Sequence, residues 1–499
     1  MSDSQPGGGS LGRLADAILL PPFQGPEVPP WVLAALERGL AGVMIYGSNV
    51  VSTEQLSALT ALLRAATGTE PVIATDEEGG DVTRLAHAQG SPYPGNAALG
   101  NVDDVRLTEG VYHALGNDLA AVGVNVDLAP TVDVNTTAGN PVIGTRSFGA
   151  EPGLVARHAV AAVTGLQSAG VAACAKHFPG HGSTRHDTHH VLATIDGDLD
   201  LVRQRDLPPF QAAVAAGVAA VMPGHLRVPG LTADLPATQS AAALEGLLRG
   251  ELGFTGVIIS DALEMRAVSQ ANGISDAAVR AVAAGVDLLC LGRDQDEEAY
   301  LAIRAAVVSA VTDGVLQAER LELAAARSAR FRTMLAAKTP SAVRPGDSLT
   351  DIGLAAARRA LRVSGPSSAV TDPVVIEFAP QDNIAVGSVP WGLRPWLPAG
   401  SVIQVPIGGG ADHDALVSGA VKLAAGRSVV AVVRDAHRDT GAQDVITRLL
   451  AERPDTVVVE MGLPVWRPPA GTYVATYGAS RTSGQAAAEV LGLTEPGAA

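Results

Sequence analysis

Short apolar runs alternate with longer amphipathic stretches along the first two thirds of the chain. Each run is followed by polar or glycine-rich residues and then by a helical pattern such as ARHAVAAVTGLQSAG or VRAVAAGV. Nearly continuous apolar strands in a β-α repeat are typical of a parallel sheet covered on both faces. The eight predicted strands lie within residues 16–21, 39–47, 71–80, 123–130, 170–180, 219–225, 256–265 and 285–292.

This repeat predicts an α/β fold, a (β/α)8 TIM-like barrel followed by a smaller α/β sandwich domain. Eight β-α units over roughly 330 residues favour a closed barrel over an open doubly wound sheet. Further on, strand-like runs such as SVVAVVR and TVVVEMG alternate with helical stretches, which predicts a three-layer sandwich. The polar stretch AKTPSAVRPGDSL separates the two patterns. We therefore expect a barrel domain at 1–338, a linker at 339–350 and the sandwich domain at 351–499.

Charge and composition exclude several classes of partner. The chain has 35 Lys and Arg against 51 Asp and Glu, a net charge of −16, which gives no broad footprint for nucleic acid or anionic membranes. No apolar stretch approaches the ~18 residues of a transmembrane helix. The polar N-terminal tail lacks the features of a signal peptide, so we expect a cytoplasmic enzyme. Cys174 and Cys290 lie in apolar runs and are predicted to be buried free thiols.

Polar side chains follow several predicted strands. Asp76 follows PVIAT, and Lys176 and His177 follow AACA. His225 comes after AAVMPG, and Asp261 comes after GVIIS. The carboxyl ends of barrel strands converge on one face, where active sites are built. The positions of these side chains therefore predict one site.

The stretch KHFPGHGSTRHDTHH, residues 176–190, holds five of the chain's 11 histidines. Within it, Asp187 and His189 are two positions apart, and such side chains face the same way in an extended segment. A carboxylate beside one ring nitrogen fixes the tautomer of a histidine and raises its basicity, which suits a general acid/base. An Asx-type loop with a solvated histidine is the alternative that these residues leave open.

The same histidines raise the question of a metal site. His181, His186, His189 and His190 have suitable side chains for zinc. However, the sequence contains neither HExxH nor a second cluster of histidines and carboxylates. We therefore predict no metal and no cofactor.

Asp261 has two interpretations from sequence alone. A carboxylate directly after an apolar strand lies at the barrel mouth, where it can attack an anomeric carbon and form a covalent glycosyl-enzyme. Alternatively, Asp261 or Ser260 caps a helix that begins at ALEMRAV. The residues themselves do not decide between these roles.

The motifs together resemble a known family. KHFPGHG, followed after four residues by DTH, occurs with an upstream DEEGG-xxx-R, with TRSFG and with a downstream SDALEM. This set resembles glycoside hydrolase family 3, and more closely its β-N-acetylglucosaminidase branch, the NagZ-like enzymes. The resemblance covers the whole barrel, and the ending VVVEMGLP…ATYGASRTSGQAAAEVL resembles the second domain of two-domain members.

The resemblance implies a role for each motif residue. Asp261 would be the nucleophile, and His189 would be the general acid/base, oriented by Asp187. The −1 sugar site would be lined by Asp76, Arg84, Arg146, Lys176 and His177. For Lys176 and Arg146, a structural ion-pair network around the nucleophile is the alternative. The implied partner is a small oligosaccharide or glycoside with a terminal GlcNAc, from cell wall or chitin, and not a nucleic acid or a membrane.

Three positions depart from the family pattern. Asp81 stands where the family usually has arginine, DALEM replaces DDLSM, and His190 directly follows the dyad. None of these changes removes a catalytic group, but they put details of sugar recognition in doubt.

The implied reaction is hydrolysis by double displacement with net retention. A phosphorylase that uses the same residues is the main alternative, because a histidine acid/base adds no negative charge that would repel phosphate. A β-glucosidase and a non-catalytic sugar-binding protein are further alternatives.

Overall fold

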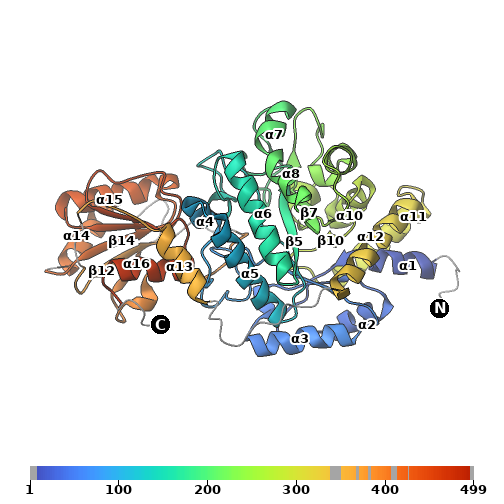
Figure 1. Ribbon diagram of the computed structural model, residues 1–499, viewed down its shortest axis with the longest axis horizontal. Helices are drawn as coiled ribbons and strands as arrows, with labels where there is room; N and C mark the ends of the chain where they lie inside the picture. The colour runs from blue at the N-terminus through green and yellow to red at the C-terminus, as the bar shows by residue number, and fades with distance from the viewer. Residues whose placement is uncertain are drawn as a thin grey trace. The chain divides into compact units, whose positions relative to one another are not determined.

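The computed structural model describes residues 8–337, 350–366, 370–379, 384–405, 413–424 and 426–494. The chain forms two compact units (Figure 1). Unit 1 comprises Met1–Glu77, Thr108–Thr136 and Ala150–Asp347, and unit 2 comprises Glu78–Leu107, Thr137–Gly149 and Ser348–Ala499. Most of the predicted linker lies outside the described residues. The predicted domain boundaries therefore stay a prediction.

Unit 1 is built on a parallel sheet whose central part has six strands. Its apolar side chains, among them Val72, Val126, Ala172 and Ile259, form one buried cluster. The strands in spatial order are β2 (Gly42–Met44), β3 (Val72–Thr75), β4 (Val126–Asp127), β5 (Ala172–Phe178), β7 (Ala220–Pro223) and β9 (Val257–Ile258).

Two further strands close this sheet into a ring. β1 (Leu19–Leu20) and β10 (Leu289–Cys290) pair in parallel. Beside β1, the N–H of Met44 donates to the carbonyl of Pro21 at 3.0 Å. Beside β10, Ile259 forms a parallel bridge with Leu288. The eight strands correspond to the eight predicted apolar runs, so the predicted barrel fold is confirmed.

Helices follow the barrel strands, as the β-α repeat predicts. A short parallel pair, β6 (Ala193–Thr194) with β8 (Leu226–Arg227), lies outside the ring. The helices of unit 1 are α1 (Gly8–Asp16), α2 (Pro30–Arg38), α3 (Thr53–Ala65), α5 (Val105–Ala121, whose first residues belong to unit 2), α6 (Pro152–Ser168), α7 (Leu199–Arg205), α8 (Leu207–Ala215), a π-helix at Ala242–Glu251, α9 (Arg266–Ser269), α10 (Gly273–Ala284), α11 (Glu297–Thr312) and α12 (Ala318–Ala337).

Unit 2 contains a six-stranded sheet in the order β11-β16-β15-β14-β12-β13. Neighbouring strands of this sheet pair in parallel, except β11 and β16, which pair antiparallel. The strands are β11 (Arg362–Ser364), β12 (Val374–Phe378), β13 (Val402–Val405), β14 (Val429–Val433), β15 (Val457–Glu460) and β16 (Thr472–Ala475). The helices are α4 (Asn96–Val102), α13 (Thr350–Ala360), α14 (His413–Leu423), α15 (Thr440–Glu452) and α16 (Arg481–Val490).

Alternation along β14 explains the layers of unit 2. Val429 and Val433 belong to the buried cluster that includes side chains of α14 and α15. Val430 and Val432 belong to the cluster that includes side chains of α16. Since successive side chains of a strand face opposite ways, the sheet is covered on both sides (Figure 1). The predicted α/β sandwich is therefore confirmed.

Neither unit contains a membrane span within its described residues, because none of their helices is both long and apolar enough to cross a bilayer. Cys174 and Cys290 are buried free thiols in the core of unit 1, as predicted.

Candidate active site

Asp261 lies three residues after β9, at the carboxyl end of that strand. Its Oδ1 accepts the N–H of Ala262 at 2.8 Å. Burial raises the pKa of this carboxyl group, but the nearby charges of His225, His177 and His189 and the Ala262 N–H lower it by more. The resulting pKa lies below the ordinary value for aspartate, so Asp261 is ionised at neutral pH.

Lys176, near the carboxyl end of β5, and Asp76, directly after β3, form an ion pair in which Lys176 is buried and Asp76 is partly buried. Lys176 Nζ lies 2.7 Å from Asp76 Oδ1, and the lysine side chain is only 2% exposed. Both residues were predicted from their positions after strands. The pair matches the structural ion-pair alternative, and it also leaves two strong hydrogen-bonding groups at the carboxyl face of the barrel.

His177 is held by Asp133, a residue that the sequence analysis missed. His177 Nδ1 lies 2.8 Å from Asp133 Oδ2, and Asp133 is fully buried. Asp133 Oδ1 also accepts the backbone N–H groups of His177, at 3.2 Å, and His181, at 2.6 Å. The available signal was the position of Asp133 just after the predicted strand at 123–130, the same signal that singled out Asp76 and Asp261.

Asp187 and His189 form the predicted dyad. His189 Nδ1 lies 2.7 Å from Asp187 Oδ1, which also accepts the His189 backbone N–H at 2.8 Å. Burial raises the pKa of Asp187, but the hydrogen bonds and charge of His189 bring that pKa below its ordinary value. The ionised carboxylate therefore favours the His189 tautomer that carries its proton on Nδ1.

The dyad and the Asp261 segment lie next to each other. The backbone N–H of Arg266, at the start of α9, donates to the carbonyl of His189 at 3.3 Å. Asp261 is five residues before Arg266 in the chain. Together with the charge interactions between His189 and Asp261, this bond brings the predicted nucleophile and the predicted acid/base into one site of unit 1.

The remaining histidines of the motif do not form a metal centre. His181 is buried, and its ring nitrogens lie 2.6 Å from Thr184 Oγ1 and 3.2 Å from Thr188 Oγ1. His186 and His190 are exposed. Among the residues that the structure describes, no three His, Cys, Asp or Glu side chains are placed to hold a metal ion.

The loop after β5 approaches the loop after β4 very closely. A Cβ atom at Gly182 would lie 2.0 Å from the carbonyl oxygen of Val134. Only glycine fits such an approach, which explains the second glycine of KHFPGHG. This contact and the Asp133 hydrogen bonds fix the first half of the motif.

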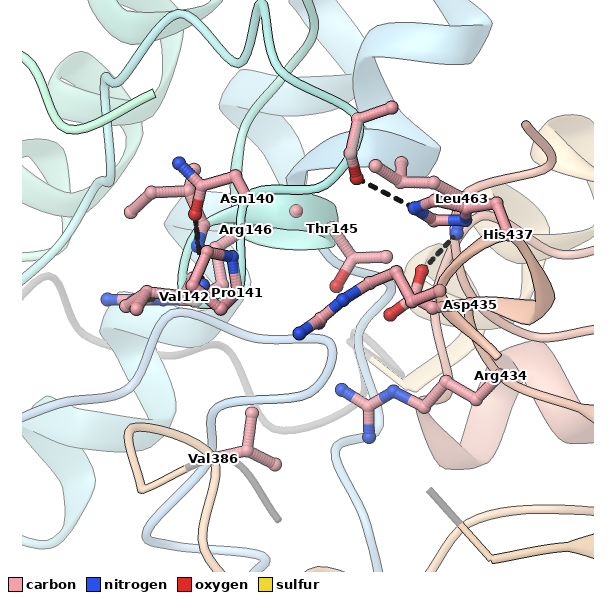
Figure 2. Close-up of a pocket in the computed structure, with 14 residues that line it drawn as sticks. Asn140, Pro141, Val142, Thr145, Arg146, Val386, Arg434, Asp435, His437 and Leu463 are labelled. Carbon is pink, nitrogen blue, oxygen red and sulfur yellow. Dashed lines mark hydrogen bonds between the residues drawn. The ribbon is translucent and has the colours of Figure 1, made fainter. Parts of the chain in front are cut away.

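Arg84 and Arg146 lie in unit 2. Arg146 forms a bidentate pair with Glu78, with distances of 2.9 Å from Nε and 2.7 Å from Nη2. Arg84 donates to the carbonyl of Ala385 at 2.9 Å. Arg146 lines a pocket of unit 2 together with Thr145 and Arg434 (Figure 2). The structure therefore groups six of the eight predicted residues in unit 1 and these two arginines in unit 2.

Asp81, the residue that departs from the family pattern, has a structural role in unit 2. It is buried and lies 2.8 Å from Arg434 Nη2. It also accepts the Thr145 hydroxyl at 2.5 Å and the Ala479 N–H at 2.8 Å. The pairs Asp81–Arg434 and Glu78–Arg146 balance the charge of two arginines that line the pocket.

Comparison with known proteins identifies the family of the chain. Residues 32–331 match the glycosyl hydrolase family 3 N terminal domain. The chain belongs to glycosyl hydrolase family 3. The predicted family and the predicted enzyme class, a glycoside hydrolase, are therefore confirmed.

Two β-hexosaminidases and the structure of a β-N-acetylglucosaminidase are among the proteins similar to this chain. A β-hexosaminidase A of Pseudoalteromonas piscicida is 34% identical over 334 residues, which cover 62% of this chain and 56% of that protein. A β-hexosaminidase of Stenotrophomonas maltophilia is 37% identical over 255 residues, which cover 50% of this chain and 75% of that protein. The structure of a family 3 β-N-acetylglucosaminidase from a Paenibacillus species has a TM-score of 0.85 and 31% identity over 97% of both chains.

Proposed function

We propose that this glycoside hydrolase is a retaining exo-β-N-acetylglucosaminidase that releases terminal β-linked GlcNAc. The observation that carries the proposal is the Asp187–His189 dyad, hydrogen-bonded through the His189 carbonyl to the segment that follows Asp261. A carboxylate nucleophile and a histidine acid/base in one site are the two groups that double displacement requires.

In the first step, Asp261 attacks the anomeric carbon of the bound sugar. Its pKa below the ordinary value keeps the carboxylate ionised and therefore nucleophilic. Protonated His189 donates its Nε2 proton to the glycosidic oxygen, and the C–O bond to the leaving group breaks. The products of this step are the free aglycone and the α-linked glycosyl ester of Asp261, because the carboxylate attacks from the face opposite the leaving group.

In the second step, neutral His189 removes a proton from water at Nε2. The hydroxyl oxygen attacks the anomeric carbon, and the bond to Asp261 breaks. The sugar leaves with its original β configuration, and Asp187 stabilises the imidazolium that has formed.

The sugar-binding groups of unit 1 would be Lys176, Asp76 and His177, with Arg84 and Arg146 assigned to the same sugar by resemblance. The Lys176–Asp76 pair presents both a donor and an acceptor for sugar hydroxyl groups. Asp133 fixes the orientation of the His177 ring through Nδ1. The GlcNAc specificity rests on the names of the relatives, which are β-hexosaminidases and a β-N-acetylglucosaminidase.

The first test measures p-nitrophenol release from β-GlcNAc and β-glucose substrates. We expect cleavage of the GlcNAc substrate, and we expect Asp261→Asn and His189→Ala each to lose about 100- to 1,000-fold or more in kcat. His186→Ala is the matched control, because His186 is an exposed histidine of the same loop. A wild-type enzyme inactive on GlcNAc, or unchanged activity in both site variants, would contradict the proposal. Proton NMR of the first product checks retention, since inversion would give the α anomer.

Phosphorolysis is a second candidate because the acid/base is a histidine. After the first step His189 is neutral, so the acid/base itself adds no negative charge beside the anomeric carbon and repels an approaching phosphate less than a carboxylate acid/base would. The test repeats the assay with inorganic phosphate and follows the product by phosphorus NMR. Hydrolysis predicts a turnover independent of phosphate, whereas phosphate-dependent turnover with formation of an α-sugar 1-phosphate would establish the phosphorylase.

The cellular role, turnover of cell wall or chitin fragments in the cytoplasm, is part of the same proposal. Fractionation of intact cells checks it, and recovery of the activity outside the cells would count against it.

A further inference from the structure

His225 is a buried histidine with no role in the mechanism given above. It lies two residues after β7 and is 0% exposed. Its Nε2 lies 2.9 Å from the carbonyl oxygen of Ala262, and its Nδ1 lies 2.8 Å from Thr238 Oγ1. Both ring nitrogens therefore have a partner, and one of these partners is the residue next to Asp261.

The chemistry of the two partners fixes the tautomer. A carbonyl oxygen only accepts, so Nε2 of His225 must carry a proton and donate it to Ala262. Burial lowers the pKa of His225 by more than the charge of Asp261 raises it, which favours the neutral ring at neutral pH. In the neutral Nε2–H tautomer, Nδ1 is the nearest acceptor for the single proton of the Thr238 hydroxyl, at 2.8 Å, whereas the carbonyl oxygens of Gly224 and Pro223 lie at 3.0 and 3.3 Å. Thr238 thus orients the ring, and the ring presents one N–H group to Ala262.

Both backbone groups of Ala262 are consequently engaged. Its carbonyl receives the His225 Nε2–H, and its N–H donates to the Asp261 carboxylate at 2.8 Å. Fixing the carbonyl restricts the backbone dihedrals of Ala262, and with them the direction of its N–H. That N–H selects the orientation of the carboxylate. A chain of hydrogen bonds therefore runs from Thr238 through His225 and Ala262 to Asp261.

We propose that His225 is a positioning residue for the nucleophile: its Nε2–H group holds Ala262, and through Ala262 it holds the Asp261 carboxylate in the orientation needed for attack. This inference rests on the proposed glycosidase function. His225 itself does not touch the substrate in this role.

The contact acts on orientation more than on folding of the segment. The Ala262 carbonyl also accepts the N–H of Met265 at 3.3 Å, so it keeps a partner when His225 is replaced. Loss of the His225 donor therefore leaves the turn formed but widens the range of Asp261 orientations. Misplacement of a reacting group by about 1 Å lowers rates by about 100-fold.

The experiment compares His225→Gln with His225→Asn. The glutamine amide nitrogen reaches the position of Nε2 and keeps a donor to Ala262, whereas the shorter asparagine amide matches Nδ1 and reaches only Thr238. We expect the glutamine variant to retain most of its activity and the asparagine variant to lose about 10- to 100-fold in kcat. Thermal unfolding of both variants is measured in parallel, and His225→Leu, which has no donor, should behave as the asparagine variant does.

A series of aryl β-GlcNAc substrates with good and poor leaving groups separates this role from general acid catalysis. A nucleophile defect should lower the rates of all substrates by a similar factor, and added azide should not restore them. In contrast, His189→Ala should lose most of its activity on substrates with poor leaving groups. Added azide should restore part of its turnover on substrates with good leaving groups.

Three results would overturn the inference while the wild type remains active. The first is an asparagine variant that is as active as the glutamine variant. The second is a loss of activity that parallels the loss in unfolding temperature across the variants. The third is a loss of activity that is confined to substrates with poor leaving groups. If the wild type itself cleaves no β-GlcNAc glycoside, the proposed function fails first, so the two failures are distinguishable.

Discussion

At the scale of single residues, the site keeps two partly enclosed carboxylates ionised. Burial alone would favour the neutral acid, as it does for any carboxyl group removed from water. For Asp261, the surrounding histidines and the Ala262 N–H outweigh burial. For Asp187, the hydrogen bonds and charge of His189 do the same. Neighbouring charges and hydrogen bonds therefore hold both carboxylates in their charged form.

This arrangement predicts the acid limb of the pH–rate profile. A lowered pKa means that Asp261 and Asp187 keep their charge as the pH falls below the ordinary range of aspartate, about 4. The acid limb of kcat/KM should therefore lie below about pH 4. Initial rates on an aryl GlcNAc substrate check this, with circular dichroism at each pH as the control for folding. An acid limb near pH 6 in a folded enzyme would contradict the predicted carboxylate states.

The sequence predicted those site residues that strand ends or the DTH spacing mark. Asp76, Lys176 and Asp261 could be found because each follows an apolar run. Asp133 was missed because its partner His177 is 44 residues away. No local pattern shows which distant group will donate a hydrogen bond to a carboxylate in a loop. The helix-cap alternative for Asp261 also needed the structure, because α9 begins only at Arg266 and Asp261 therefore does not cap it.

At the scale of elements, the loop between β5 and α7 carries the dyad and is held at its far end by α7. Asp198 caps that helix by accepting the Leu201 N–H. From the last turn, Arg205 Nη2 donates to Ser183 Oγ and to the Asp196 carbonyl, each at 2.9 Å, and it lies 2.8 Å from Asp206 Oδ2. The Arg205 guanidinium therefore connects Ser183 and Asp196, near the two ends of the loop, to Asp206 between α7 and α8.

Two arginines of α7 provide a matched comparison. Arg205→Ala leaves the fully buried Asp206 without its ion-pair partner and releases Ser183, so we expect a loss of about 3 kcal/mol in the free energy of unfolding and a lower kcat. Arg203→Ala removes an exposed pair with Glu251 and should cost less than about 1 kcal/mol. Urea unfolding and p-nitrophenyl assays measure both. Equal effects of the two substitutions would show that Arg205 does not brace the loop.

The fold was predictable at this scale because its elements repeat. Each barrel strand is a short apolar run, and the same signal marked β12 to β16 in unit 2. The sequence did not predict the grouping of Glu78–Leu107 and Thr137–Gly149 with unit 2, because these segments are loops between barrel strands. Contacts such as Asp81 with Arg434 join residues more than 350 positions apart, and no local pattern signals them.

At the scale of the whole molecule, Glu460 links the stability of unit 2 to pH. It is fully buried at the end of β15 and accepts the N–H groups of Asp435, Ala436 and Gly462. Burial, and then the neighbouring charge of Asp435, raise its pKa to about 8. An unfolded chain would release this proton near the ordinary value of 4.5. Between these values the folded state binds more protons, so stability falls as pH rises.

We therefore expect the free energy of unfolding of unit 2 to decrease by up to about 1.4 kcal/mol per pH unit between about pH 5 and 8 from this group. Glu460→Gln should remove that part of the slope. Urea unfolding followed by tryptophan fluorescence measures it, because Trp391, Trp396 and Trp466 lie in unit 2 and only Trp31 lies in unit 1. Identical slopes in wild type and variant would mean that the three N–H donors keep Glu460 ionised.

The closure of the barrel has a consequence for synthesis of the chain in the cell. β1 pairs with β10, so the ring cannot close until Leu289, the partner of Leu19, has been synthesised. At about 5–20 residues per second, the 270 residues between these partners take roughly 15 to 50 seconds to emerge from the ribosome. During that time the edge of β1 that pairs with β10 is exposed. The barrel is therefore expected to need protection by chaperones for longer than the sandwich, whose most widely separated strand partners, Arg362 and Ala475, are 113 positions apart.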